Sequence, residues 1–273
     1  MSTNLLIIGN GYIGKRIQES LGFPLCDKKL YTLQDAEKEI ARFKPRVIVN
    51  SVGYIGRNVD DCEVNKDKTL FANTFIPILL AEAALRHGIK LVHISSGCIF
   101  HYDYDKDRPL DEKRTPDFFE LYYSRTKIYA EQAIAALAER YGVLILRIRV
   151  PLDDRPHPKN ILTKLIKYKT VIDLPNSVTY IPDFIKALRH LVRTDARGIY
   201  HVVNKGGLRY PELLDVYRQR VPSFSYTKVP FKKLGMVRTN VVLSTAKLER
   251  SGFPVRTIQE VLEECVNGYL ASS

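Results

Sequence analysis

Short apolar runs alternate with longer amphipathic segments through the first half of the chain. The runs are almost continuously apolar and end on small or polar residues, which is typical of strands covered on both faces. They are residues 4–8, 46–53, 89–96 and 143–150. The segments between them repeat apolar residues at helical spacing. These are residues 12–21, 70–88 and 124–142. The alternation predicts βαβ crossovers and an α/β, doubly wound fold around a parallel sheet.

The second half has a different texture after Pro151. A polar, proline-rich stretch, "PLDDRPHPKN", opens it, and short helical and strand-like segments such as residues 198–203 follow. We therefore expect residues 1–150 to form one domain, to which the chain returns around residues 178–204. Residues 151–273 are expected to form mainly a smaller C-terminal lobe.

The composition is ordinary for a soluble globular protein, with 45% hydrophobic and 26% charged residues among 273. No apolar run approaches the roughly 18 residues of a membrane span, and no basic region precedes the first apolar stretch. We therefore expect a cytoplasmic protein without a membrane partner. The cysteines lack metal-ligand spacing and are too few for a disulfide framework, which predicts free thiols and no metal site. They are Cys26, Cys62, Cys98 and Cys265.

The formal net charge of +12 raises the question of a nucleic-acid partner. The basic residues are spread along the chain, with modest clusters at residues 163–169 and 228–233. Neither a basic arm nor a nucleic-acid-binding motif accompanies them. We therefore expect no nucleic-acid partner, and attraction of a polyanionic small molecule fits the charge as well.

The first strand runs directly into "GNGYIG", a G-x-G-x-x-G pattern that opens a helix. Its glycines allow a tight turn and close approach of the main chain to a pyrophosphate, which the free N–H groups of the helix N-terminus then face. The pattern predicts a Rossmann-type dinucleotide site. Its residues are Gly9, Asn10, Gly11, Tyr12, Ile13 and Gly14.

The second strand carries a weaker signal about which dinucleotide binds. Asp27 is followed there by Lys28 and Lys29, and no acidic residue clearly ends the strand. Two lysines can receive a ribose 2′-phosphate. The stretch therefore favours NADPH, with NADH as the alternative.

Tyr123 and Lys127 are four residues apart in "YYSRTK", so on a helix they share one face. An ammonium beside a phenol favours the phenolate and can also bind a cofactor ribose. Tyr123 is therefore a candidate proton donor to a carbonyl oxygen. The spacing alone is common by chance and indicates a surface pair, unless a serine ends the preceding strand. Ser96 occupies that place.

The glycine-rich turn, Ser96, Tyr123 and Lys127 together resemble the extended short-chain dehydrogenase/reductases. Within them the chain is similar to the dTDP-4-dehydrorhamnose reductase group, and most similar to its bifunctional UDP-4-keto-6-deoxyglucose 3,5-epimerase/4-reductases. The resemblance runs over nearly the whole chain and is carried by "GRNVDDCE", "SSGCIF", "TPDFFELYYSRTK", "LRIRVP", "NILTKLIKY", "LPNSVT" and "RTN". It implies an NADP-binding Rossmann domain, a substrate-binding C-terminal lobe and a nucleotide-sugar substrate between them.

The resemblance also gives Cys98 a role. The monofunctional reductases of the group typically read S-T-D-Y-V-F where this chain reads "SSGCIF". The bifunctional ones carry the cysteine and pair it with a lysine that corresponds to Lys164. In that family the two are base and acid for inversion at C3 and C5, whose protons the 4-keto group acidifies. Without the resemblance, Cys98 is better interpreted as a small buried hydrophobe and Lys164 as a solvated helix charge.

Further residues are expected along the two ligands. The expected cofactor contacts, besides the glycine turn, Lys28, Tyr123 and Lys127, are Ser51, Val52, Gly53, Asn73, Ser95 and Val150. Asn73 is expected to brace the strand exit at Ser51–Gly53. The expected substrate contacts, besides Ser96 and Cys98, are Arg57, Asn160, Asn176 and Arg238. The last three lie in stretches expected to hold the nucleotide diphosphate, and for Arg57 a plain surface charge is the alternative.

The sequence therefore predicts an NDP-4-keto-6-deoxyglucose 3,5-epimerase and NADPH-dependent 4-ketoreductase that makes an NDP-L-rhamnose. One alternative is a reductase that relies on a separate epimerase. Another is a non-catalytic NADP-binding regulatory subunit, since a regulatory subunit of methionine adenosyltransferase resembles this family. The intact set of Ser96, Tyr123 and Lys127 argues against the second alternative. A homodimer is one candidate assembly.

Overall fold

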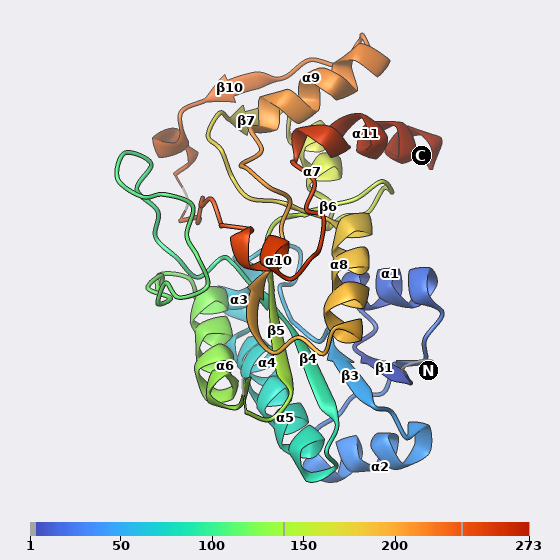
Figure 1. Ribbon diagram of the computed structural model, residues 1–273. Coiled ribbons are helices and arrows are strands. Elements are labelled where there is room, and N and C mark those ends of the chain that lie inside the picture. Colours follow the sequence, from blue (N-terminus) through green and yellow to red (C-terminus); the bar gives the residue numbers. More distant parts are fainter. Residues whose placement is uncertain (1–3, 139, 236, 273) are drawn as a thin grey trace. The chain divides into compact units, whose positions relative to one another are not determined.

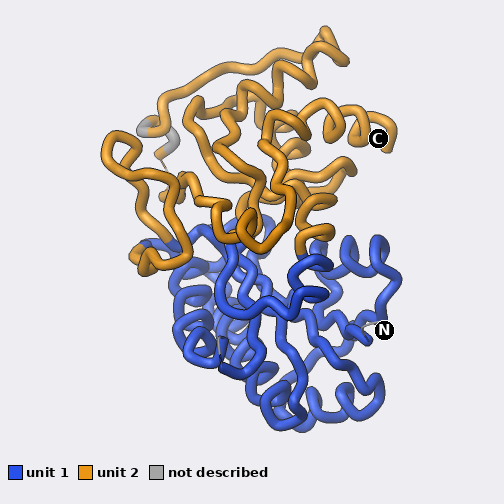
Figure 2. Tube along the Cα trace, viewed as in Figure 1, with its two compact units in different colours: residues 1–99, 118–147, 188–200 blue, residues 100–117, 148–187, 201–273 orange. Residues whose placement is uncertain are grey.

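The computed structural model describes residues 4–138, 140–235 and 237–272. The chain divides into two compact units, each assembled from separate stretches of sequence (Figure 2). Unit 1 comprises residues 1–99, 118–147 and 188–200. Unit 2 comprises residues 100–117, 148–187 and 201–273.

Unit 1 contains the main sheet and the helices that cover it. Its elements are β1 (Leu5–Ile8), α1 (Tyr12–Leu21), β2 (Leu25–Cys26), α2 (Leu33–Phe43), β3 (Val47–Asn50), α3 (Asp61–Val64), α4 (Lys66–Leu70), the π-helical turn η1 (Phe71–Phe75), α5 (Ile76–Arg86), β4 (Lys90–Ser96), α6 (Tyr122–Ala138), β5 (Val143–Ile148) and β9 (Gly198–His201). The helix α8 (Ile181–Arg193) starts in unit 2 and ends in unit 1.

The sheet of unit 1 has six strands in the order β2-β1-β3-β4-β5-β9. Figure 1 labels β1, β3, β4 and β5 among them. β1 pairs in parallel with β2 on one side and β3 on the other, and β3 pairs in parallel with β4. The strand order reverses between β1 and β3. Doubly wound sheets bind ligands beyond the carboxyl ends of the strands at such a point. The sheet confirms the predicted α/β doubly wound fold.

The strands are apolar on both faces because both faces are covered. Leu6, Ile8 and Ile48 pack in one cluster with apolar residues of α2, α5 and α6. Ile7 points to the opposite face and has no exposed surface. The helices end at residues that suit their termini. α1, for example, stops at Gly22, whose φ of 70° is readily adopted by glycine.

Several element boundaries differ from the predicted ones. α6 begins at Tyr122, two residues early, while β3 and β5 end early, at Asn50 and Ile148. The helix predicted over residues 70–88 begins at Lys66 and runs through α4, η1 and α5 to Arg86. Its first turn, "KDKTL", is polar and gives no apolar period, so its start was not visible in the pattern.

The stretch Lys66–Arg86 bears on the expectation that no apolar run approaches the length of a membrane span. Within the described part of the chain it is a helix of 21 residues that is long and apolar enough to cross a membrane, and its most apolar 18-residue window has a mean hydropathy of 1.3. Half of its most apolar window is buried inside the structure. The buried core helix of a globular protein meets the same criterion.

Unit 2 has short strands and a helical core. Its elements are β6 (Pro151–Leu152), α7 (Ile161–Tyr168), β7 (Thr170–Ile172), β8 (Thr179–Tyr180), α9 (Tyr210–Arg220), β10 (Thr227–Val229), the 3-10 turn η2 (Phe231–Leu234), α10 (Ala246–Arg250), the 3-10 turn η3 (Gln259–Val261) and α11 (Leu262–Ala271). β10 pairs in parallel with β7, and β6 with β8. Apolar residues of α7, α9 and α11 form its core.

Candidate active site

The glycine turn after β1 is packed so tightly that side chains are excluded at two positions. A Cβ on Gly14 would lie 2.0 Å from the Gly9 carbonyl oxygen, and one on Gly9 would lie 2.8 Å from both Ser51 Oγ and Val52 N. Gly9 also has a φ of 110°. These glycines therefore bring α1 and β3 close to the turn.

Gly11 has a different environment, because no atom lies within 4 Å of a Cβ built on it. It is the N-cap of α1, and no side chain caps the helix there. The first turn of α1 contains no acidic residue. The space beside Gly11 is therefore open, and a helix N-terminus in such a place fits an anion. Asn10 is exposed beside Gly11, and Tyr12 and Ile13 are partly exposed.

The exit of β3 is fastened to the glycine turn by Ser51. Its hydroxyl lies 3.0 Å from the Ile8 carbonyl oxygen and 2.9 Å from that of Gly9. A Cβ on Gly53 would lie 3.5 Å from Lys127 Nζ. The loop Ser51–Gly53 therefore joins the dinucleotide turn to the candidate catalytic lysine within unit 1.

Asn73 lies in the π-helical turn and holds the same loop. Its Oδ1 accepts the Tyr54 N–H at 2.7 Å, and its Nδ2 donates to the Tyr54 carbonyl at 3.0 Å. The Nδ2 also lies 3.2 Å from Thr126 Oγ1 on α6. π-helical turns of this kind often occur at functional sites.

Lys28 has a partner that the sequence did not reveal. Its Nζ bonds to Glu39 Oε1 at 2.6 Å, and the Glu39 side chain is almost fully buried. Glu39 comes from α2, eleven residues further along the chain, so no strand-end pattern pointed to it. A carboxylate from another element thus shares the charge of one of the two lysines expected at the 2′-phosphate.

The reductase-type residues lie on β4 and α6. Ser96 is buried at the end of β4, and its Oγ accepts the Cys98 N–H at 3.1 Å. The Cys98 carbonyl accepts the Ser124 hydroxyl at 2.6 Å. Cys98 is partly exposed, whereas the other three cysteines are buried, and none of the four forms a disulfide.

Lys127 is almost fully buried, and its Nζ lies 3.5 Å from the Ile94 carbonyl oxygen. Burial lowers the pKa of Lys127 to about 8, and the charge of Glu131 opposes this shift. Cys62 and Cys98 add smaller opposing contributions to this pKa. The ammonium is therefore maintained near neutral pH by its acidic neighbours rather than by solvent.

Glu131 belongs to a buried network that sequence reasoning missed. It accepts the Ser95 hydroxyl at 2.8 Å and pairs with Arg147 of β5, whose Nε lies 2.8 Å from Glu131 Oε1. Ser95, predicted beside the cofactor, therefore has its hydroxyl bonded within this network. The available signal was the position of Glu131, one helical turn after Lys127 on the same face.

His93 of β4 is a second buried group that was missed. Its Nδ1 lies 3.1 Å from Asn50 Nδ2 of β3. Burial, and then the charge of Lys127, lower the pKa of His93 well below its usual value. The imidazole is therefore neutral beside the lysine at neutral pH.

Arg57 lies on an exposed loop of unit 1 and is paired with Asp61. Its Nη2 lies 3.2 Å from Asp61 Oδ1, and its main-chain N–H donates to Asp61 Oδ2 at 2.8 Å. The hydrogen bond to Asp61 raises the pKa of Arg57. The side chain is 91% exposed and accessible to a ligand.

Unit 2 places two of the predicted residues in one basic cluster. Lys164 is partly exposed on α7. Burial lowers its pKa, and the charges of Lys159 and Arg238 lower it further. Two cations whose charges act on Lys164 make a polyanion nearby favourable. Arg238 also donates to the Val237 carbonyl at 2.7 Å.

The two predicted asparagines of unit 2 are buried, and their side chains bond to other groups of the protein. Asn160 caps α7 through Leu162 N–H and donates to the carbonyls of Asp153 and Arg155 at 2.8 and 2.9 Å. Asn176 accepts Arg149 Nε at 3.1 Å and Val241 N–H at 3.2 Å. Its Nδ2 also donates to the Tyr210 hydroxyl. Their amides are therefore engaged within unit 2.

Val150, predicted beside the cofactor, lies in unit 2 between β5 and β6. Its φ of 26° is unusual for a β-branched residue and indicates local backbone strain. Its carbonyl accepts the Thr179 N–H at 3.3 Å.

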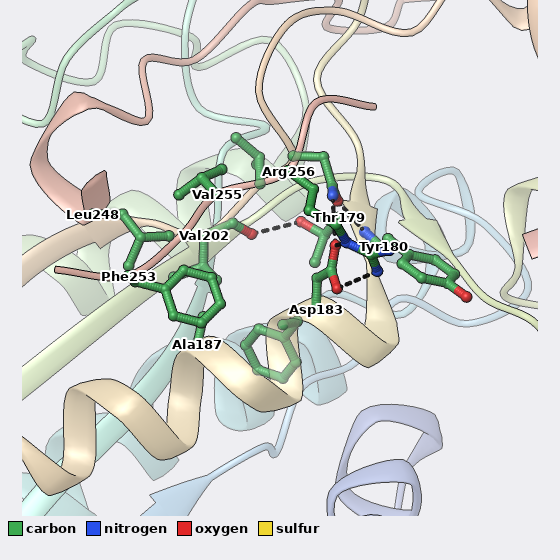
Figure 3. A pocket seen from close by; sticks show the side chains of 12 residues that line it. Thr179, Tyr180, Asp183, Ala187, Val202, Leu248, Phe253, Val255 and Arg256 are labelled. Carbon is green, nitrogen blue, oxygen red and sulfur yellow. Dashed lines mark hydrogen bonds and ion pairs between the residues drawn. The ribbon is translucent and has the colours of Figure 1, made fainter. Parts of the chain in front are cut away.

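A small pocket in unit 2 cannot hold a sugar nucleotide. It has a volume of about 10 Å³ and is lined by residues such as Thr179, Asp183 and Arg256 (Figure 3). Arg256 Nε donates to Asp183 Oδ2 at 3.0 Å, and the Thr179 hydroxyl donates to the Val202 carbonyl at 2.8 Å. These groups are paired with one another. Within the described residues, no group of three or more His, Cys, Asp or Glu side chains could hold a metal ion.

Comparison with curated proteins finds relatives over almost the whole chain. The bifunctional dTDP-4-dehydrorhamnose 3,5-epimerase/dTDP-4-dehydrorhamnose reductase of Arabidopsis thaliana is 31% identical over 281 residues, which cover 96% of this chain and 91% of that protein. A trifunctional UDP-glucose 4,6-dehydratase/UDP-4-keto-6-deoxy-D-glucose 3,5-epimerase/UDP-4-keto-L-rhamnose-reductase of the same plant is 30% identical. That match covers 96% of this chain but 41% of the larger protein.

Solved structures with the same fold include two enzymes of nucleotide-rhamnose synthesis. The UDP-rhamnose synthase of Acanthamoeba polyphaga mimivirus gives a TM-score of 0.88 at 24% identity, covering 97% of this chain and 99% of that one. A dTDP-4-dehydrorhamnose reductase of Bacillus anthracis in complex with NADP gives 0.83 at 23% identity, covering 96% and 98%. At these identities the likeness shows the fold.

The family comparison covers both units. Residues 8–270 match the family described as RmlD substrate binding domain. This range includes the glycine turn, the β4 and α6 residues and the basic cluster of unit 2. Together with the relative that is 31% identical over 96% of the sequence, the match shows that this chain belongs to the RmlD substrate-binding domain family.

Proposed function

We propose that this chain reduces the C4 keto group of an NDP-4-keto-6-deoxyglucose and also inverts C3 and C5, giving an NDP-L-rhamnose. The observation that carries the proposal is the pair of hydrogen bonds on Cys98. Its N–H is bonded to Ser96, and its carbonyl to Ser124, the residue next to Tyr123. A thiol inside a reductase-type set fits a protein with both activities. The bifunctional Arabidopsis relative supports the same combination.

The cofactor we propose is NADPH, which supplies the hydride for C4 when bound. The tight turn at Gly9 and Gly14 and the open, uncapped start of α1 fit a dinucleotide pyrophosphate. The complex of the Bacillus anthracis structure with NADP supports this choice. Lys28 and Lys29 remain the candidates for the 2′-phosphate, although Lys28 shares its charge with Glu39.

In the proposed reduction, Tyr123 donates a proton to the C4 oxygen. Lys127 follows it by one helical turn, so its ammonium favours the phenolate that is left behind. The hydroxyl of Ser96 accepts the Cys98 N–H and therefore retains its own proton to donate to the same oxygen.

In the proposed inversion, the Cys98 thiolate removes the proton from C3 or C5. Tyr123 and Ser96 stabilise the resulting enolate oxygen, and Lys164 returns a proton to the opposite face of the carbon. No electrons are transferred in this step. The lowered pKa of Lys164 makes its ammonium a better acid than a solvated lysine, which supports the role.

The diphosphate is expected to bind the basic cluster of unit 2. Arg238 and Lys159 are its proposed contacts because they already crowd Lys164 with positive charge. Asn160 and Asn176 are proposed to shape this region through their bonds to the main chain. Arg57 of unit 1 is a proposed substrate contact as well, because most of its side chain is exposed.

The test is incubation of the purified protein in D₂O with NADPH and UDP- or dTDP-4-keto-6-deoxyglucose, followed by NMR of the product. We expect deuterium at C3 and C5 and the L-rhamno configuration. Cys98→Ser should stop deuterium uptake and still allow reduction of a substrate that is already epimerised. If this variant exchanges both protons at the parental rate, Cys98 has only a packing role. The chain would then resemble the reductase of Mycobacterium tuberculosis, which is 26% identical over 166 residues.

A further inference from the structure

The first turn of α6 is bonded to the residue that bears the candidate base. Ser124 has no exposed surface, and its hydroxyl donates to the Cys98 carbonyl at 2.6 Å. A short hydrogen bond in a buried place is costly to lose, because the carbonyl would remain without that donor. Ser124 therefore constrains the Cys98 peptide strongly.

The Cys98 main chain is held from a second direction by Ser96, whose Oγ accepts the Cys98 N–H at 3.1 Å. The next residue, Ile99, accepts the Phe118 N–H at 3.1 Å. The N–H and the carbonyl belong to the two peptide units that flank Cys98, so both units are held in orientation. The direction of the Cα–Cβ bond, and so the region that the thiol reaches, follows from this orientation.

The helix that carries Ser124 is itself fixed by other contacts. The Tyr122 N–H, at the start of α6, donates to Glu63 Oε1 at 2.6 Å. Further along, the Thr74 hydroxyl donates to the Thr126 carbonyl at 2.8 Å. The start of α6 is therefore held in place by contacts that do not involve Cys98. The hydrogen bond from Ser124 then fixes Cys98, which follows β4, relative to this helix.

We propose that Ser124 is a positioning residue. It holds Cys98 at a fixed place relative to Tyr123, so that both side chains can reach the same bound sugar. The inference rests on the proposed function. It adds that inversion depends on a residue that touches neither substrate nor cofactor. Proton transfer is sensitive to displacements of about 1 Å, which can cost about 10²-fold in rate. Loss of the Ser124 hydroxyl should therefore impair inversion much more than reduction.

The experiment compares Ser124→Ala with the matched variant Thr74→Val. Each removes one buried hydroxyl that donates to a main-chain carbonyl and involves α6, but only Ser124 bonds to Cys98. Deuterium exchange at C3 and C5 is measured in D₂O, and reduction is measured with a pre-epimerised 4-keto sugar. For Ser124→Ala we expect kcat for exchange to fall about tenfold or more, with KM and the reduction rate changed much less. Thr74→Val should keep the parental ratio of exchange to reduction.

A second readout does not depend on inversion. The rate of Cys98 alkylation by iodoacetamide, followed by peptide mass spectrometry, should change several-fold in Ser124→Ala and stay parental in Thr74→Val. Equal alkylation rates and an equal exchange ratio in both variants and the parent would overturn the role of Ser124. A parent protein that exchanges no proton would overturn the proposed inversion and the need to position Cys98 for it. The alkylation rates would still show in that case whether Ser124 holds Cys98.

Discussion

The two groups of candidate residues differ in how firmly the fold holds them. In unit 1, Ser96 ends a buried strand, Lys127 is buried in a 17-residue helix, and each side chain makes a hydrogen bond to the main chain. In unit 2, Lys164 is partly exposed on an eight-residue helix, and Arg238 lies in a loop. Protonating one oxygen requires a fixed geometry, whereas a diphosphate can be attracted by charge over a longer range. The looser placement suits Arg238 as the proposed diphosphate contact, whereas Lys164 as the proposed acid requires a defined position as well.

The same comparison holds for the electrostatics of the two lysines. Burial lowers the pKa of both. Around Lys127 the next contribution is the charge of Glu131, which raises the pKa and preserves the ammonium. Around Lys164 the next contributions are Lys159 and Arg238, which lower the pKa further. The neighbouring charges thus oppose the effect of burial on the pKa at Lys127 and add to it at Lys164.

The comparison is tested most severely by Tyr123→Phe, because reduction should depend entirely on the rigid group of unit 1. Removing the only proton of the phenol should lower kcat for reduction of a pre-epimerised sugar by about 10²–10⁴-fold. NADPH binding, measured by fluorescence titration, should stay close to the parental value. Tyr129→Phe, on the exposed part of the same helix, is the control. Parental reduction in Tyr123→Phe would refute the assignment.

Lys164→Met probes the other region and should affect the other activity. It removes the charge at similar length, so inversion should fall by about 10²-fold, as for the loss of a general acid. Reduction of the pre-epimerised sugar should fall less, mainly through KM. Lys167→Met, an exposed lysine near the end of the same helix, is the control. If Lys164→Met lowers only the affinity for substrate, the lysine binds the diphosphate and is not the acid.

The part of the site that could be predicted from the sequence depends on local spacing. The glycine turn, the serine at the end of β4 and the i, i+4 pair of Tyr123 and Lys127 are each encoded within a few residues, and the apolar period fixed the order of the elements around them. These features led to the fold class and to most of the unit 1 candidates.

The missed features depend on contacts between distant parts of the chain. Glu63 and the Tyr122 N–H are 59 residues apart, and Ser124 and Cys98 are 26 apart. Asn176 was placed at the diphosphate because of its stretch of sequence, but its amide bonds to Val241, 65 residues away. No pattern within one segment specifies which distant group a polar side chain will contact. Only the packed chain determines those partners.

Glu131→Gln tests whether the charge of Glu131 raises the pKa of Lys127. With a pKa of about 8, Lys127 loses its proton as the pH rises through that value, so reduction should decline on the basic side. Removing the Glu131 charge lowers this pKa further and should move the decline to lower pH, by about 1 unit. Profiles of log kcat against pH for reduction are the measurement, with the surface variant Glu82→Gln as control. A decline that stays in place or moves to higher pH would contradict the role of Glu131.

The Glu131 variant also breaks the buried pair with Arg147, which typically costs about 3–5 kcal/mol. Thermal unfolding should therefore accompany the profiles, and rates should be measured well below the Tm of the variant. Partial unfolding would lower kcat, whereas loss of the Glu131 charge moves the pH at which kcat declines. The pH profile therefore separates the two effects.

The smallest effect is expected at Lys28 and Lys29 of unit 1, which are exposed to solvent. We predict that the parent binds NADPH more tightly than NADH, and that Lys28→Ala with Lys29→Ala reduces this preference about threefold, within the range of exposed charge pairs. The effect is small because Glu39 already neutralises part of the Lys28 charge at 2.6 Å. Lys44→Ala, at the C-terminal end of α2, is the control, and Glu39→Gln should raise the preference for NADPH by releasing Lys28.

The measurement is the dissociation constant of each dinucleotide, determined by calorimetry at two salt concentrations. Equal affinity for the two dinucleotides in the parent would show that other residues meet the ribose, whereas a preference that falls with added salt in the parent but not in the double variant would assign it to this pair of lysines.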